Sequence, residues 1–272
     1  MTSPRSAARE RDRRRPASAA RALLAVLALA PAGPARGTNA PGAPPVPVLV
    51  ELFTSEGCSS CPPADALLAR LVRTQPVAGA EIVALGLHVD YWDRLGWKDP
   101  FSSPLHSARQ KRYAERLGSD RVSTPQAVVD GAVEIVGSDE RRLVGAVAAA
   151  ARSPKAPVRL SAGPPRGKRL PSSVRIDALA ASAGDVAVFV ALVEDARATD
   201  VRRGENAGRR LEHAAVVRSL AEIGRPAGDG RPFEWQGEIP ATTQSDSLVV
   251  FAQERRTGRV LAVGRLRLVP AR

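Results

Sequence analysis

The chain has 272 residues, of which 44% are hydrophobic and 25% charged, and it carries a formal net charge of +12. This composition is typical of a globular protein, which excludes wholesale disorder. No apolar run approaches the roughly 20 residues of a membrane span, which excludes a multi-span membrane protein. Eight arginines and two acids in residues 1–36 supply half of the excess charge. No later basic run alternates with aromatic residues, so we expect no nucleic-acid partner.

The first segment has the three parts of a bacterial secretory signal peptide. Arginines are frequent up to Arg21, an apolar stretch covers residues 22–30, and residues 30–32 read Ala-Pro-Ala, like a cleavage site. We therefore expect a signal peptide over residues 1–35 and a flexible leader over 36–45. The protein is then periplasmic or secreted, with no membrane span after cleavage. An amphipathic organelle transit peptide is the alternative.

The next part of the chain predicts a small α/β layer. Its strands are short apolar runs, its first helix opens with two prolines, and Asp130-Gly131 between apolar runs indicates a hairpin. The expected elements are strands over 46–53, 81–89, 126–129 and 133–136, and helices over 62–73, 105–117 and 139–151.

The pattern changes after a Pro/Gly-rich connector, because the later segments alternate or run apolar at strand lengths with turns between them. This pattern predicts an all-β, sandwich-like domain. The expected domains are 46–152 and 173–272, joined by a linker over 153–172. The expected strands are 158–161, 174–179, 186–193, 210–219, 233–239, 248–253 and 260–268.

The two cysteines of the chain, Cys58 and Cys61, form a C-x-x-C pair between a buried strand and a helix. The amides and dipole of a helix N-terminus stabilise a thiolate there. We expect Cys58, one turn outside the helix, to be the exposed nucleophile. Cys61 is then the more shielded cysteine that resolves the mixed disulfide.

Three other interpretations of the pair stay open. A structural disulfide is one, although a four-residue loop constrains little chain entropy. A zinc half-site is another, but the three histidines lack the usual ligand spacing. A copper site of both cysteines and one histidine suits soft thiolates. The favoured interpretation requires no cofactor and no metal.

Two further positions support redox chemistry. Thr124-Pro125 opens a strand, where a cis proline would face the cysteines and expose the Thr124 backbone to a substrate chain. An ordinary strand-initiating proline is the alternative. Glu51 is an acid in an apolar strand seven residues before Cys58. It would relay a proton to Cys61 if buried nearby, or face water at an edge.

Several sequence blocks resemble a known family. The order of these features resembles the thioredoxin superfamily: a strand, the C-x-x-C pair, a helix, Thr-Pro, a hairpin and a helix. The blocks below resemble, over about residues 46–270, a secreted bacterial family called domain of unknown function 1223 (DUF1223). The resemblance implies a thioredoxin-like α/β domain followed by the β-rich domain, a redox pair, and Pro125 as the cis proline. The blocks are VELFTSEGCSSCPPAD, HVDYWDRLGWKDPF, STPQAVVDG, IVGSD and RGENAGRRLEHAAVVRSL.

An aromatic loop follows the second expected strand. Tyr91, Trp92 and Trp97 lie in it, and His88 ends the strand before it. Ligands bind at the carboxyl ends of strands in open α/β sheets, so we expect these residues to form a substrate-binding wall beside the cysteines. The alternatives are aromatic packing between the two domains and a hydrogen-bonded structural role for His88. Residues 204–208 are expected to form a turn.

Together these observations predict an exported thiol–disulfide oxidoreductase-like protein acting on a protein or a small thiol or disulfide. The alternative is a non-enzymatic periplasmic protein that handles copper, or a binding or assembly protein in which the C-x-x-C disulfide is only structural.

Overall fold

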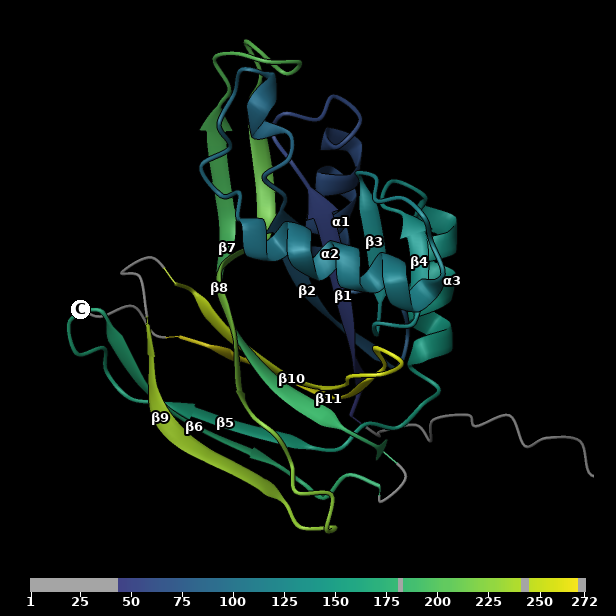
Figure 1. Cartoon of the computed structure of the whole chain (residues 1–272), viewed down its shortest axis with the longest axis vertical. Coiled ribbons are helices and arrows are strands. Elements are labelled where there is room, and N and C mark those ends of the chain that lie inside the picture. The colour runs from purple at the N-terminus through teal and green to yellow at the C-terminus, as the bar shows by residue number, and fades with distance from the viewer. Residues whose placement is uncertain (1–43, 181–182, 241–244, 269–272) are drawn as a thin grey trace, which may run out of the picture. The chain divides into compact units, whose positions relative to one another are not determined.

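Strands dominate the secondary structure of the chain. A computed structural model describes residues 44–180, 183–240 and 245–268 (Figure 1). The expected signal peptide and nearly all of the expected leader lie outside these residues. The elements are β1 (Val46–Thr54), α1 (Pro62–Thr74), β2 (Ala80–His88), the 3₁₀ helix η1 (Asp93–Leu95), α2 (Pro104–Leu117), β3 (Gln126–Val129), β4 (Val133–Val136), α3 (Glu140–Ala150), β5 (Val158–Ala162), β6 (Arg169–Ile176), β7 (Val186–Asp200), β8 (Arg210–Gly224), β9 (Phe233–Pro240), β10 (Ser247–Glu254) and β11 (Val260–Arg267).

Eight of the described strands form one mixed sheet in the order β11-β10-β7-β8-β2-β1-β3-β4. Strands β1 and β2 are parallel, and β3 and β4 add antiparallel strands at one edge. At the other edge β8, β7, β10 and β11 are successively antiparallel. The two parts join where Gly86 of β2 pairs in parallel with Val216 of β8.

The junction of β2 and β8 depends on a close backbone approach. A Cβ atom at Gly86 would lie 2.9 Å from the carbonyl oxygen of Ala214, so a larger residue would push the strands apart. Ala215, beside the pairing residue, has a positive φ of 53°, which alkyl side chains disfavour. This local geometry lets β8 continue the sheet beyond β2.

The expected fold class, a thioredoxin-like α/β domain followed by an all-β domain, is wrong. The structure is mostly β-sheet, and strands from the C-terminal half extend the same sheet that contains β1–β4. The edge of β2 explains the difference, because an unpaired edge leaves backbone N–H and C=O groups without partners. Here β8 occupies that edge, so the two expected folds merge into one sheet.

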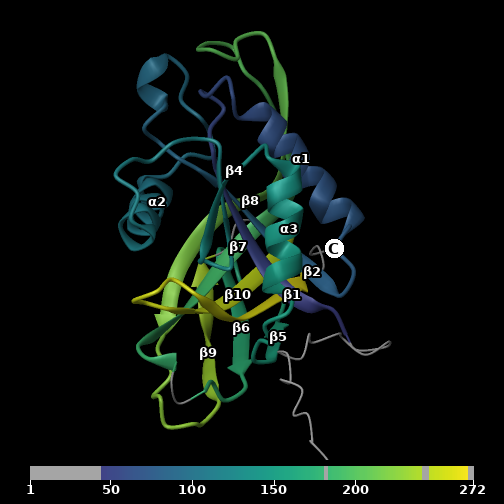
Figure 2. The same cartoon turned by 90° about the vertical axis from the view of Figure 1, so that its right-hand side faces the viewer.

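The helices and a smaller sheet cover the large sheet. Figure 2 shows α1 and α3 on one face and α2 on the other. Their apolar side chains pack with β1, β2 and β3 in one core. A second core lies between the antiparallel sheet β5-β6-β9 and strands β7, β10 and β11. This second packing is sandwich-like, as the alternating pattern predicted.

The start of α1 positions the cysteines. Pro62 and Pro63 occupy the first helical positions, where their missing N–H groups cost no helical hydrogen bond. Buried Leu67, Leu68 and Leu71 fix the inner face of the helix on the sheet. Cys61 is the N-cap, so the C-x-x-C pair sits directly at the helix N-terminus. None of the helices in the described segments has the length and hydrophobicity of a transmembrane helix.

Candidate functional site

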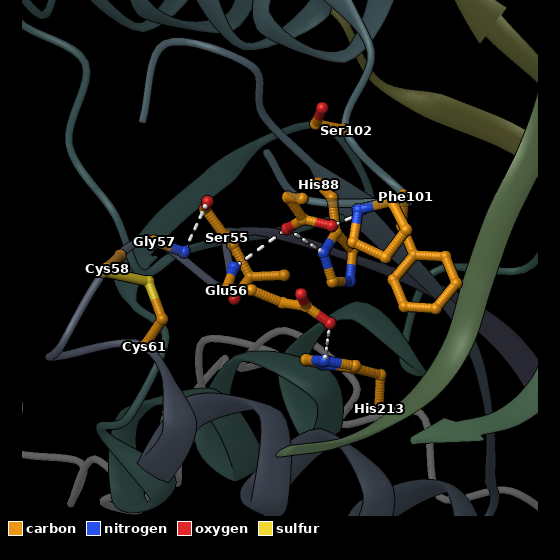
Figure 3. Close-up of polar contacts among 12 residues, drawn as sticks. Ser55, Glu56, Gly57, Cys58, Cys61, His88, Phe101, Ser102 and His213 are labelled. Carbon is orange, nitrogen blue, oxygen red and sulfur yellow. Dashed lines mark hydrogen bonds and ion pairs between the residues drawn. A yellow bond between two sulfur atoms is a disulfide. The ribbon is translucent and has the colours of Figure 1, made fainter. Parts of the chain in front are cut away.

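Cys58 and Cys61 form a disulfide in the turn between β1 and α1 (Figure 3). Their Cα atoms are 5.4 Å apart. The carbonyl oxygen of Cys61 accepts the amide N–H groups of Ala64 and Asp65, which anchors the pair to the first turn of the helix. The dipole of this helix end favours negative charge on the sulfur atoms when the pair is reduced.

The expectation that Cys58 is exposed is wrong. Cys58 and Cys61 both have 0% of their surface exposed, while Ser59 and Ser60 between them face solvent. The structure therefore places neither sulfur on an open surface. Two segments far away in the sequence cover Cys58. One is the residues just before β3, at Thr124, and the other is the turn between β7 and β8.

Thr124 contacts the sulfur of Cys58 directly. The Thr124–Pro125 peptide is cis, as expected from the sequence. The Thr124 hydroxyl oxygen lies 3.3 Å from Cys58 Sγ, and the indole N–H of Trp92 donates to that oxygen at 2.9 Å. An indole N–H only donates, so the hydroxyl proton of Thr124 remains available for the sulfur. Ser60 Oγ also lies 3.3 Å from Cys58 Sγ.

The turn between β7 and β8 covers the cysteine turn from another side. The side-chain amide of Asn206, which is fully buried, donates to the carbonyl oxygens of Glu56 and Cys58, both at 2.9 Å. The Glu205 carboxylate accepts the amide N–H of Ser59 at 2.9 Å. The expected turn over residues 204–208 thus contributes two residues to the site, which sequence reasoning treated only as a turn.

A buried network of charged side chains lies behind the cysteine turn. The Glu56 side chain extends away from the disulfide toward His213, whose Nε2 lies 3.1 Å from its carboxylate (Figure 3). Asp65 is 3.8 Å from the other ring nitrogen. Burial alone would lower the pKa of His213, but Asp65 and Glu56 raise it to about 9. The ring is therefore a buried cation between two carboxylates at neutral pH.

His88 belongs to the same network rather than to an open wall. Its Nδ1 lies 2.7 Å from the Asp99 carboxylate, which also accepts the Glu56 amide N–H at 2.8 Å. Burial opposes ionisation of Asp99, but His88 and the amides of Glu56 and Phe101 outweigh it and lower the Asp99 pKa. The His88 and His213 rings are in edge contact, with centroids 4.7 Å apart.

The three loop aromatics are half-buried and hydrogen-bonded. Trp92 is bound to Thr124, while Trp97 donates its indole N–H to Glu56 Oε2 at 2.7 Å. Tyr91 packs against Trp92 and donates to the side chain of Gln110. The structure thus brings Trp97 to Glu56 of the cysteine turn and Trp92 to Thr124, which contacts Cys58. Tyr91 instead points its hydroxyl toward α2.

The structure does not connect Glu51 to the cysteines through any contact in the described residues. Its fully buried carboxylate accepts Arg109 Nε at 2.5 Å and Nη2 at 2.9 Å, and also accepts the Tyr113 hydroxyl. Burial would lower the pKa of Arg109, but Glu51 beside it raises that pKa above its ordinary value. Glu51 therefore neutralises a buried guanidinium on the α2 side of the sheet.

Sequence reasoning missed Glu56, Asn206 and His213. Glu56 is two residues from Cys58, so its position was a usable signal. Asn206 and His213 are 148 and 157 positions away from their partners Cys58 and Glu56. No local motif marks either of them, because long-range packing of β8 on β2 and α1 brings this strand and its preceding turn to the cysteines.

Comparison with known proteins places the chain in a family. The family model described as "Protein of unknown function (DUF1223)" matches residues 49–253. A crystal structure of an Agrobacterium tumefaciens protein is 29% identical, with a TM-score of 0.65, covering 84% of this chain and 96% of that chain. No curated protein matches the sequence. Since the family match extends over more than half of the sequence, the chain belongs to the DUF1223 family of proteins of unknown function.

Proposed function

We propose that the Cys58–Cys61 pair performs thiol–disulfide exchange with a protein or a small thiol or disulfide. The contact of the Thr124 hydroxyl with Cys58 Sγ carries this proposal. A hydroxyl that donates to sulfur stabilises a thiolate, and so does the N-terminus of α1 beside it. A purely structural disulfide would need neither an oriented donor nor a helix terminus.

The exchange reaction follows from the positions of the two sulfur atoms. In the reduced pair, the Cys58 thiolate attacks one sulfur of a substrate disulfide, and the other substrate sulfur leaves as a thiolate that takes a proton from water. The Cys61 thiolate then attacks Cys58 Sγ and releases the second substrate thiolate, which is also protonated. The substrate gains two electrons and two protons, and the pair is oxidised. The reverse sequence oxidises a dithiol.

Access to Cys58 requires local movement, because neither sulfur is on an open surface. The Glu205 contact to Ser59 is solvent-exposed, so it is the weaker of the two contacts that the β7–β8 turn makes with the cysteine turn. The buried Asn206 hydrogen bonds are the stronger restraint. We propose that substrates reach Cys58 when this turn moves away.

The same proposal includes export to the periplasm or the cell exterior. The arginine-rich and then apolar N-terminal segment supports it, since this is the order of a secretory signal peptide. An oxidising compartment allows the disulfide to persist between reaction cycles. Copper handling gains no comparable support. The described residues hold no group of three or more metal-ligating side chains suited to an ion, and His88 is engaged by Asp99.

Two measurements test the proposal. Titration of the purified protein against glutathione should give a reduction potential between about −120 and −270 mV, the range of known exchange proteins. The Cys61→Ser variant should accumulate a mixed disulfide with glutathione through Cys58, whereas Cys58→Ser should accumulate less. A disulfide that resists reduction below about −300 mV and traps no partner would make the pair a structural one.

A further inference from the structure

A basic cavity opens on the α2 side of the large sheet, away from the residues that the proposed exchange uses. Its volume is about 250 Å³, and four arginines line it: Arg109, Arg112 and Arg116 from α2, and Arg255 from the turn after β10. The ring of Phe189 from β7 contributes an apolar wall. Such a concentration of cations around one small concavity attracts anions.

Helical spacing explains how three arginines reach the same cavity. Positions 109, 112 and 116 are separated by three and four residues, so they share one face of α2. Arg109 is the fixed member of this row. Only 2% of it is exposed, and its guanidinium also lies 5.3 Å from the centre of the Phe189 ring. Its described hydrogen bonds use Nε and Nη2 and leave Nη1 without one.

The charges around the cavity do not balance. Glu51 neutralises Arg109, as shown above. Glu222 and Asp185 form ion pairs with Arg255, at 3.0 and 3.4 Å. Among the residues that the structure describes, neither Arg112 nor Arg116 forms a salt bridge. Glu222 itself lines the cavity, but Arg112 and Arg116 at the rim are left without an ion-pair partner in this part of the chain.

The electrostatic effect of this imbalance is visible on both unpaired side chains. Partial burial lowers the pKa of Arg112, and repulsion from Arg109 and Arg116 lowers it further, against a smaller opposing effect of Tyr113 and Glu115. Partial burial likewise lowers the pKa of Arg116; Tyr113 and Glu51 oppose this shift, while Arg109 and Arg255 act in the same direction as burial. A bound anion would relieve this repulsion, because it would place negative charge between the guanidinium groups.

We propose that this cavity binds a small dianionic oxyanion, the phosphate or dicarboxylate part of a small molecule, between Arg112 and Arg116. Guanidinium groups recognise both kinds of oxyanion through paired N–H donors. Two guanidinium groups without an ion-pair partner among the described residues can pair with the two charges of a dianion. The volume suits a single phosphate or a short dicarboxylate and excludes a dinucleotide. The buried Arg109 forms the floor, held by Glu51.

Calorimetric titration of the purified protein tests this site, with inorganic phosphate and succinate as separate probes at constant ionic strength. Arg112→Gln and Arg116→Gln should each weaken binding of the preferred anion about tenfold. Lys111→Gln is the matched control. It removes the same charge from the same helix, but Lys111 is exposed and does not line the cavity.

The two probes separate the chemical classes. Saturable phosphate binding that depends on Arg112 and Arg116 assigns the site to phosphate groups, and the same result with succinate assigns it to dicarboxylates. Two outcomes would overturn the proposal. One is no saturable binding of either anion at millimolar concentration, and the other is an equal loss in Lys111→Gln, which indicates only general charge. Both tested arginines lack structural ion pairs in the described residues, so these variants should fold, as circular dichroism can verify.

Discussion

The hydroxyl of Thr124 lies 3.3 Å from Cys58 Sγ, and Trp92 fixes the orientation of that hydroxyl by donating to its oxygen. This relationship crosses 66 residues of sequence. It gives the sulfur of Cys58 a hydrogen-bond donor that the helix N-terminus alone would not supply.

Replacing Thr124 with Val should make reduced Cys58 a weaker nucleophile. Valine keeps the shape of the side chain but removes the O–H donor, so the thiolate loses stabilisation and its pKa should rise by about one unit. At neutral pH the thiolate fraction would then fall up to about tenfold. The pH dependence of alkylation by iodoacetamide, measured in a Cys61→Ser background, reports this pKa.

Two further variants make that result specific. Trp92→Phe keeps an aromatic side chain but removes the indole N–H that orients the Thr124 hydroxyl, so it should shift the Cys58 pKa in the same direction by less. Thr74→Val removes an exposed hydroxyl at the end of α1 and should leave the Cys58 pKa unchanged. An unaltered pKa in Thr124→Val would refute the role of this hydroxyl.

Replacing Asn206 with Ala should make the disulfide react faster with small reductants. The variant loses two buried hydrogen bonds and leaves the carbonyl groups of Glu56 and Cys58 without their partner, which costs about 1–3 kcal/mol of stability. The β7–β8 turn should then open more often. The rate of reduction by a water-soluble phosphine, followed under native conditions, should rise, while Glu212→Gln on exposed β8 surface should leave it unchanged. Equal rates in Asn206→Ala and the unaltered protein would contradict a covering role.

The elements of this fold were predictable because their signals are local. Pro62-Pro63 before apolar residues at helical spacing marks α1, and Asp130-Gly131 marks the hairpin of β3 and β4. The joining of the two sheet halves was not predictable in this way. It rests on one pairing between Gly86 and Val216, 130 positions apart, and on the positive φ of Ala215.

In the candidate site, too, short motifs were predictable from the sequence, whereas contacts between distant residues were not. The C-x-x-C pair and Thr124-Pro125 are readable as short motifs, and their residues do meet in the structure. Glu51 shows the limit of such reasoning. A lone acid in an apolar strand indicates a buried partner, but the sequence does not say that the partner is Arg109 rather than Cys61.

Replacing Glu51 with Gln should destabilise the protein without changing the chemistry of Cys58. Glutamine keeps the size of the side chain but leaves the buried Arg109 charge without its partner, at a cost of about 3–5 kcal/mol. Urea unfolding should show this loss, and the double variant Glu51→Gln/Arg109→Met should recover much of it, because both charges are then absent. If Glu51 relayed a proton to Cys61, exchange rates would fall in the folded Glu51→Gln variant, and that outcome would contradict our assignment.

The stability of the protein should fall between pH about 6.5 and 9 because of His213. Its pKa rises from 6.5 to about 9 on folding, so the folded state holds a proton that the unfolded state releases in this window. The contribution is complete below pH 6.5 and is lost as the pH rises through 9. A shift of this size corresponds to about 3 kcal/mol. Urea unfolding at several pH values should show the decline in the unaltered protein and a much flatter profile in His213→Gln.

His106 provides the control for that pH profile, because burial lowers its pKa to about 4. As the pH falls below 6.5, the unfolded state binds a proton at His106 before the folded state does. His106 therefore lowers the stability only on the acid side of the pH profile, whereas His213 acts on the alkaline side. His106→Gln should therefore reduce the acid decline and leave the decline between pH 6.5 and 9 intact. If His106→Gln flattened the alkaline limb as much as His213→Gln does, the decline could not be assigned to the buried pairs of His213 with Glu56 and Asp65.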